Sequence, residues 1–145
     1  MTTLVNTVVT AVVAALKAAP AVCTQVDRVR LRALPQGTGL AVAVRPLVAQ
    51  VAQADFVPGV PILWHTDIAI ECYARSTATT APDVAVDALV QAVYERLMAD
   101  PTLAGVVLNL QPTSVAYEFD ADAEQTTCAI LSLTARQRCG AATFT

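Results

Sequence analysis

The chain has 145 residues and a formal net charge of −3, with 55% hydrophobic and 14% charged residues. Its basic residues are eight arginines and one lysine, without the basic surplus of nucleic-acid-binding proteins, so specific nucleic-acid binding is not expected. Soluble domains more often carry about a quarter charged residues, so either neighbours in an assembly bury apolar surface or the source genome favours alanine and valine. The length suits one domain, because a chain of this size buries roughly two-thirds of its unfolded surface.

The N-terminal segment carries apolar residues at helical spacing from Val5 to Leu16, which predicts an amphipathic helix that ends by Pro20. Lys17 follows the apolar stretch instead of preceding it, so the segment does not have the form of a signal peptide. It is also too short for a membrane span and contains polar residues such as Asn6. We therefore expect no membrane association.

Two strands are predicted next. Residues 27–34 alternate between apolar residues and arginines, which predicts a half-buried strand with a basic side. The arginines of that side are Arg28, Arg30 and Arg32. Residues 40–45 predict a second, apolar strand. Pro46 either ends this strand or bends it, and if it bends, residues 47–53 continue the strand.

Residues 55–61 contain two prolines and a glycine, which indicates a loop, and Phe56 and Val57 are apolar for exposed positions. Residues 62–75 then show the most regular alternation in the chain, which predicts a long strand with one dry and one charged face. The dry parity holds Ile62, Trp64, Ile68, Ile70 and Cys72, and the charged parity holds His65, Asp67, Glu71, Tyr73 and Arg75. Such a strand needs a covering layer on one side only.

A second amphipathic helix is predicted after a polar linker. Thr80 and Asp83 have the spacing of a capping box with Thr80 as the N-cap, and apolar residues then line one face up to about Met98. Asp100 and Pro101 are expected to end this helix.

The C-terminal part of the chain predicts further strands. Residues 106–110 form a short apolar strand that Pro112 interrupts, and residues 115–119 form a strand with an acidic side. An acidic hairpin loop follows, and it holds Asp120, Asp122 and Glu124. The closing strand is expected over residues 125–138, with its odd-numbered apolar residues inside.

The order of helix, strands, helix and strands, with the strands in adjacent runs, predicts an α+β fold. We expect a two-layer sandwich in which a mostly antiparallel sheet carries two amphipathic helices on one face. Residues 1–138 are expected to form a single domain and residues 139–145 a loose C-terminal tail.

One set of residues suggests catalysis. His65, Asp67 and Glu71 share a strand face, so a small enzyme that uses His65 with Asp67 or Glu71 as acid and base is one hypothesis. The alternative is a solvated or interface surface with paired charges. We favour the alternative, because Cys72 lies on the opposite parity and no other catalytic motif completes the set. The chain is therefore not expected to be an enzyme.

The four cysteines lie far apart without a CxxC pair, and His65 is the only histidine. No zinc site and no cofactor are expected on that basis. Cys72 and Cys128 lie inside strand patterns and are expected to be buried free thiols, as fits the cytoplasm.

The order of elements resembles a known family. The segments that carry the likeness are AVAVRP, WHTDIAIECYAR, VDALVQAVYERLMAD, LAGVVLNLQP and the closing hairpin YEFDADAEQTTCAILSLTARQR. From about Leu4 to Arg138 they resemble the tail terminator proteins of long-tailed bacteriophages, also called minor tail protein U or tail completion proteins. A head–tail connector or neck adaptor protein is the other interpretation, because such small proteins share this style.

The resemblance implies an α+β fold without cofactor or chemistry. It implies a hexameric ring on the last ring of the polymerised tail tube, at the head-proximal end of a virion tail assembled in the host cytoplasm. The ring stops tube growth and offers a surface for head attachment. The implied partners are further copies of the chain, the tail tube protein and the head–tail connector protein.

The family has no catalytic motif to carry over, so contact surfaces are inferred from the charged strand rows and the apolar loop. The rows pair either within one sheet or between subunits. Residues expected at subunit or tail-tube contacts are Arg28, Arg30, Arg32, Arg45, Phe56, Val57, Asp67, Glu71, Arg75, Asp120, Asp122, Glu124, Arg136 and Arg138.

Overall fold

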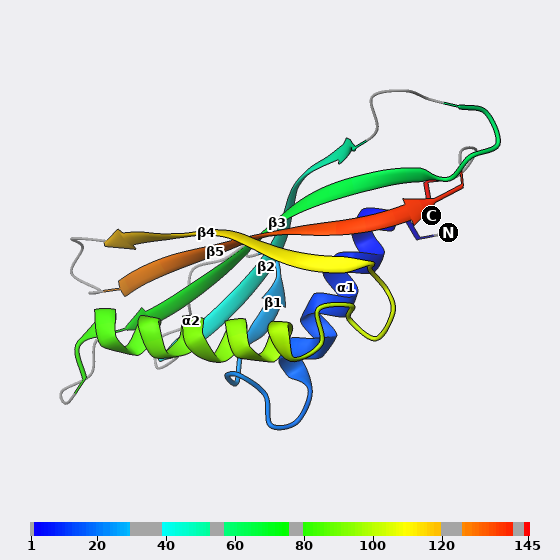
Figure 1. Ribbon diagram of the computed structural model, residues 1–145. Helices are drawn as coiled ribbons and strands as arrows, with labels where there is room; N and C mark the ends of the chain where they lie inside the picture. The colour runs from blue at the N-terminus through cyan, green and yellow to red at the C-terminus, as the bar shows by residue number, and fades with distance from the viewer. Residues whose placement is uncertain (1, 30–38, 53–56, 76–79, 120–125, 141–143) are drawn as a thin grey trace.

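The computed structural model describes residues 2–29, 39–52, 57–75, 80–119, 126–140 and 144–145. The elements in chain order are α1 (Leu4–Lys17), β1 (Val26–Arg28), β2 (Leu40–Val51), β3 (Ile62–Arg75), α2 (Pro82–Ala99), β4 (Asn109–Phe119) and β5 (Thr126–Cys139). The five strands form one sheet in the order β1-β2-β3-β5-β4, in which only the short β1–β2 pair is parallel (Figure 1). The predicted α+β fold with a mostly antiparallel sheet is confirmed.

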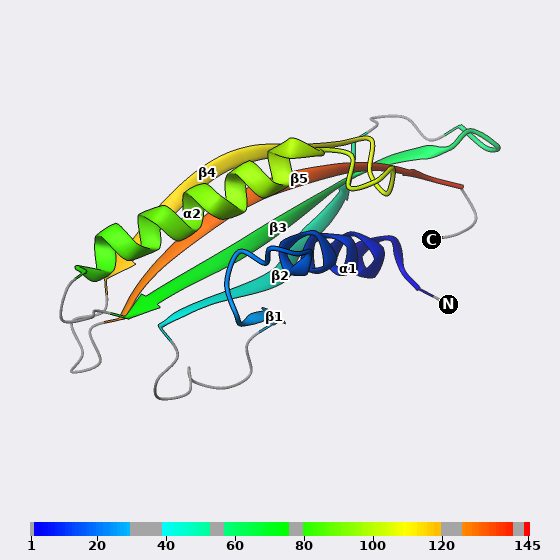
Figure 2. The same cartoon turned by 90° about the horizontal axis from the view of Figure 1, so that it is seen from below.

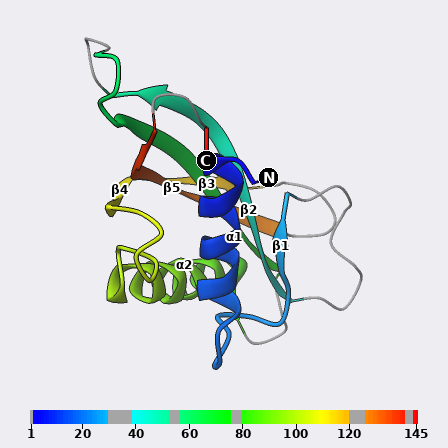
Figure 3. The same cartoon turned by 90° about the vertical axis from the view of Figure 1, so that its right-hand side faces the viewer.

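The two helices lie on the same face of the sheet, as predicted (Figures 1 and 2). Helix α1 packs over β1 and β2, and α2 packs over β3 and β5. In the part of the chain that the structure describes, no element covers the opposite face, which Figure 3 shows from the side. Neither of the two described helices is long and apolar enough to span a membrane.

The core lies between the helices and the dry parity of the central strands. Ile70 of β3 is opposite Val44 of β2 on one side and Leu131 of β5 on the other, and all three side chains are buried. Val8, Val9 and Val12 of α1 and Val86, Val93 and Leu97 of α2 close this layer from above. Each fully buried side chain of this size stabilises the fold by about 1.5–3 kcal/mol, so this layer fixes which parity of every strand faces away from the helices.

Helix α1 is capped at both ends. At its start the Thr3 hydroxyl accepts a hydrogen bond from the Asn6 backbone amide at 3.2 Å. At its end Arg96 of α2 donates to the carbonyl oxygens of Ala15 at 3.0 Å and Ala18 at 2.7 Å, and also to that of Pro20. One guanidinium therefore satisfies three carbonyls where the helix runs out of its own donors.

Two local predictions before the second half of the chain were wrong. The strand predicted over residues 27–34 is interrupted at Val29, because Val29 has a left-handed φ of 40° that a ladder does not accommodate, so β1 ends at Arg28. Residues 30–34 lie outside the described residues. The N-cap of α2 is Ala81, without a side-chain hydrogen bond, instead of Thr80. Pro82 stands at the first helical position, where its fixed φ and missing N–H suit a helix start without a capping box.

The C-terminal strands also differ from expectation. Residues 101–106 form turns and residues 107–108 a bend, so only residues 109–110 of the strand predicted over residues 106–110 are in a strand. They begin β4, which runs as one strand through Pro112. Pro112 is tolerated because β4 is an edge strand with a register shift between Pro112 and Ser114. Cys139 is the buried last residue of β5. The Phe144 ring packs edge-on against the Trp64 ring, with 5.0 Å between the ring centroids, so the C-terminal segment is not loose at either of these residues.

Thr66 is the one polar residue in the dry parity of β3, and it offers a test of the core. Its side chain is fully buried, and its hydroxyl has no hydrogen-bond partner among the residues that the structure describes. We expect Thr66→Val to raise the free energy of unfolding by about 1 kcal/mol, because a buried hydroxyl without a partner is costly. Thr66→Ser keeps the hydroxyl, loses a methyl group and should be less stable than the parent. Urea denaturation followed by circular dichroism measures both, and a valine variant less stable than the parent contradicts this reading.

Candidate interaction surface

The uncovered face of the sheet, called the open face below, carries the polar parity of the long strands. In register, Tyr73 of β3 is opposite Cys128 of β5, and His65 is opposite Arg136. The open face is defined by Arg45, His65, Asp67, Glu71, Tyr73, Cys128, Ile130, Thr134, Arg136 and Arg138. The strand parity predicted for residues 62–75 is therefore confirmed, and it brings most of the described candidate residues onto one surface.

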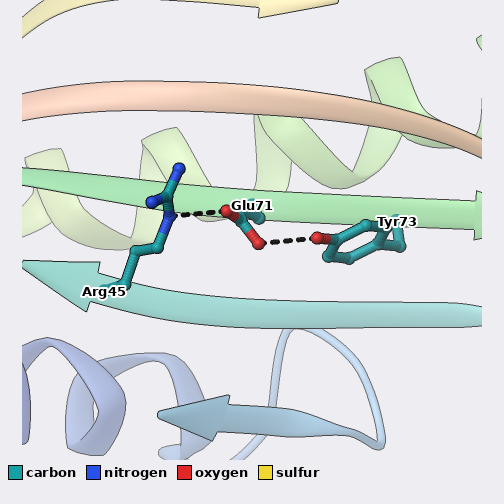
Figure 4. Close-up of polar contacts among 3 residues, drawn as sticks. All are labelled: Arg45, Glu71 and Tyr73. Atoms are coloured by element: carbon teal, nitrogen blue, oxygen red, sulfur yellow. Dashed lines mark hydrogen bonds and ion pairs between the residues drawn. The ribbon is translucent and has the colours of Figure 1, made fainter. Parts of the chain in front are cut away.

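Arg45, Glu71 and Tyr73 form a connected polar group at the centre of the open face (Figure 4). Arg45 Nε lies 2.6 Å from Glu71 Oε1, and the Tyr73 hydroxyl donates to Glu71 Oε2 at 2.6 Å. The Glu71 side chain is 14% exposed and that of Arg45 is 42% exposed. Glu71 is thus satisfied within the subunit, and Arg45 presents part of its guanidinium to solvent.

A shallow depression of about 390 Å³ adjoins this group. It is lined by Arg45, Glu71, Tyr73, Glu118, Thr126, Cys128 and Ile130, which come from β2, β3, β4 and β5. The lining mixes one arginine, two carboxylates and an aliphatic side chain. Such a recess suits a protruding polar side chain of a protein partner.

The Glu71 carboxylate is expected to stabilise the fold through its contacts with Arg45 and Tyr73. Its carboxylate forms an ion pair with the buried Arg45 Nε, which makes no hydrogen bond within the described residues, and it also accepts a hydrogen bond from Tyr73. We expect Glu71→Ala to lower the free energy of unfolding by about 1–2 kcal/mol, because two charge-assisted contacts are lost. Tyr73→Phe removes only a hydroxyl and should cost less. Denaturant titration compares the two, and equal stability of Glu71→Ala and the parent is the result that contradicts the assignment.

The structure does not assemble the acid–base set that the sequence suggested. Asp67 accepts a hydrogen bond from the Thr134 hydroxyl at 2.7 Å, and Glu71 is held by Arg45 and Tyr73. In the part of the chain that is described, His65 makes no hydrogen bond to either carboxylate, and its Nε2 is buried without a partner. The three side chains share a face, as predicted, but each acid is engaged elsewhere.

Cysteine thiols and carboxylates are the other groups that could serve as nucleophiles or metal ligands. Cys72 is a fully buried free thiol, as predicted, and burial raises its pKa to about 12, so it stays protonated at neutral pH. Cys128 is in no disulfide within the described residues and is only half-buried, so the prediction of a buried thiol is wrong there, because its parity belongs to the open face. No group of three or more His, Cys, Asp or Glu side chains within the described residues is placed to hold a metal ion.

The remaining predicted contact residues fall into three groups. Arg28 lies on the helix-covered side, where its guanidinium donates to Asn6 Oδ1 at 2.6 Å and Thr10 Oγ1 at 3.3 Å of α1. Arg136, Arg138 and Val57 are exposed, and Arg75 is half-buried at the end of β3. Arg30, Arg32, Phe56, Asp120, Asp122 and Glu124 lie outside the described residues.

Sequence reasoning missed most of the exposed apolar surface. Leu47, Val48 and Val51, which precede the predicted loop over residues 55–61, and Val60 within that loop are all exposed. Val84 of α2 and Tyr117 of β4 are exposed as well. One feature of the sequence could have indicated this exposed surface. Leu47 and Val48 are adjacent apolar residues after Pro46, and two adjacent apolar residues break the alternation expected of a half-buried strand.

Comparison with known proteins gives a fold likeness. No protein-family model matches the chain, and no curated protein matches it either. Among solved structures, the chain is similar to a chain of the structure described as "Virion of native gene transfer agent (GTA) particle", with a TM-score of 0.63 and 17% sequence identity. The likeness covers 90% of this chain and 93% of that chain. At this identity it establishes that the two chains share the helix-on-sheet fold over nearly their whole lengths.

Proposed function

We propose that this chain is a structural virion protein of a phage-like particle. The observation that carries the proposal is the end-to-end fold likeness to a chain of a gene transfer agent virion, over 90% of this chain and 93% of that one. The open face supports it, because its acids are engaged in contacts within the subunit instead of forming a reactive set. A broad sheet face of this kind suits contact with another protein.

Within such a particle, we propose that the chain forms a ring, hexameric by the family resemblance, that caps the end of the tail tube. A cap must match the last tube ring on one side and present a different surface on the other. The subunit has two unlike sides, one covered by helices and one an open sheet face. Repetition around a ring multiplies weak contacts, so the individual residues of the open face need not bind strongly.

The ring then stops growth of the tube protein and receives the head–tail connector protein. Binding of this kind is directed by shape and charge instead of by a reactive group. The mixed charges of the open face, with Arg136 and Arg138 exposed and Glu71 paired with Arg45, provide such a directional pattern.

A tube elongation assay tests this function. Tail tube protein from the same particle is polymerised with and without the purified chain, and tube lengths are measured by negative-stain electron microscopy. We expect tubes to stop lengthening once one end carries the chain. Unchanged growth together with binding to the connector protein supports a neck adaptor instead, and binding to neither overturns the proposal.

A further inference from the structure

Exposed apolar side chains gather at one end of the molecule, in a segment called the hairpin arm, which comprises residues 47–52 and 57–62. Its exposed apolar members are Leu47 at 50%, Val48 at 44%, Val51 at 47%, Val57 at 56% and Val60 at 46%. The burial pattern of β2 changes at Arg45, after which nearly every residue is exposed. Within the described residues, β1 pairs with residues 42–44 and not with this second half of β2. The described residues of the arm contain no charged side chain.

A second apolar site lies between α2 and β4 and is called the α2–β4 groove. It has a volume of about 370 Å³ and is lined by Asp83, Val84, Asp87 and Tyr117. Val84 is 59% exposed, and the Tyr117 hydroxyl donates to Asp87 Oδ1 at 3.1 Å, which holds the ring as one wall. This contact and burial raise the pKa of the Tyr117 hydroxyl, so it remains a donor at neutral pH.

The arm and the groove lie at opposite ends of the subunit. The arm leads into β3 at Ile62, whereas Tyr117 is level with Ala129 and, through it, with Cys72 near the other end of β3. The ten residues between these levels of β3 correspond to about 33 Å at the usual rise of a strand. Figures 1 and 2 agree, with residues 57–62 at the right-hand end and the start of α2 at the left. The arm therefore cannot reach the groove of its own subunit.

Among the described residues, the fully exposed charges beside the two sites are opposite in sign, and the half-buried Arg75 at the groove end is the exception. Arg136 and Arg138 are exposed at the arm end of β5, where Arg138 is opposite Leu63. Asp83, Asp87 and Glu118 are exposed at the groove end. A contact between an arm end and a groove end thus brings arginines towards carboxylates, whereas arm-to-arm or groove-to-groove contact sets like charges together.

We propose that the hairpin arm of one copy of this chain docks in the α2–β4 groove of the next copy, head to tail. The inference rests on the proposed ring and names the contact that builds it. A heterologous contact between different patches uses one arm and one groove per subunit, and it closes when the rotation between neighbours completes a ring. It also buries both exposed apolar sites at once, in a chain whose composition is unusually poor in charge.

Two variants separate the halves of this contact. Val60→Asp places a charge on the arm, Val84→Asp places one in the groove, and both positions are exposed, so the subunit should stay folded by circular dichroism. Each variant alone should assemble at least tenfold more weakly than the parent in sedimentation velocity, with or without tail tubes. Val29→Asp, at an exposed valine in neither site, is the matched control and should assemble like the parent.

Mixing the two variants decides between contact types. The Val60→Asp copy keeps its groove and the Val84→Asp copy keeps its arm, so the mixture should give one-to-one dimers and stop there. Normal rings from either variant overturn the arm–groove contact but leave the ring itself standing, and so does a mixture that gives only monomers. If the parent chain forms no ring alone or on tubes, the proposed function fails and the inference fails with it.

Discussion

Replacing Arg96 by alanine is expected to lower the free energy of unfolding by about 2–3 kcal/mol, the largest single loss that we anticipate outside the apolar core. Arg96 belongs to α2 but donates to Ala15 and Ala18 at the end of α1 and to Pro20 beyond it. Its removal leaves three carbonyls without this donor and takes a positive charge from a helix C-terminus, where the macrodipole favours one. The two helices also lose their main polar connection.

Two control variants make this expectation specific. Arg96→Lys keeps the charge, but a single ammonium group cannot reproduce the planar fork that reaches several carbonyls, so less than half of the stability should return. Lys17→Ala removes an exposed charge from the last turn of the same helix and should change stability by less than about 0.5 kcal/mol. Guanidinium denaturation measures all three, and a loss for Arg96→Ala no larger than that for Lys17→Ala contradicts the capping role.

Reversing the charges of Arg136 and Arg138 together is expected to weaken assembly by at least about tenfold without unfolding the subunit. Both side chains are exposed on the open face at the arm end of β5, so the fold does not depend on their charge. In the proposed arm–groove contact they face carboxylates of a neighbour, and such contacts between exposed charges weaken as salt rises. The wild-type assembly should therefore lose affinity between low and high salt, and the Arg136→Glu/Arg138→Glu variant should lose much less.

Sedimentation velocity over a salt series checks this expectation. Lys17→Glu reverses an exposed charge on the helical side of the subunit and is the control, since it should leave assembly and its salt dependence unchanged. If the double variant assembles as the parent does at every salt concentration, the basic end of β5 is not part of a contact.

The strands with period-two alternation could be predicted from the sequence with little error. β3 covers residues 62–75 as predicted, and β5 runs to Cys139, one residue beyond the predicted end. Residue 125, where β5 was predicted to begin, lies outside the described residues. Both β3 and β5 are central strands with one covered face, so burial imposes the alternation on their sequence. The strand predicted to begin at residue 106 begins only at Asn109. Leu103 and Val107 lie before it in a turn and a bend, but they are buried, and a run of buried apolar residues has the same sequence pattern as a short strand.

The candidate surface was predictable in its parity but not in its partners. That Glu71 and Tyr73 share a face follows from their spacing, whereas the ion pair of Glu71 with Arg45 depends on how β2 and β3 are aligned. Arg96 caps α1 through hydrogen bonds to carbonyls that lie between 76 and 81 positions earlier in the chain. No local sequence pattern predicts a contact over such a separation. The exposure of the hairpin arm was not predicted either. The alternation of residues 27–34 predicted a longer first strand, whereas β1 ends at Arg28.

Electron microscopy of tail tubes incubated with gold-labelled chain tests the central claim most directly. A ring that caps the tube predicts label at one end only, the head-proximal end in intact tails, and no label along the shaft. The same grids without tail tube protein show whether the chain forms rings by itself. Label spread along the tubes, at both ends, or absent from tubes that have stopped growing contradicts the proposal that this chain is the terminating ring.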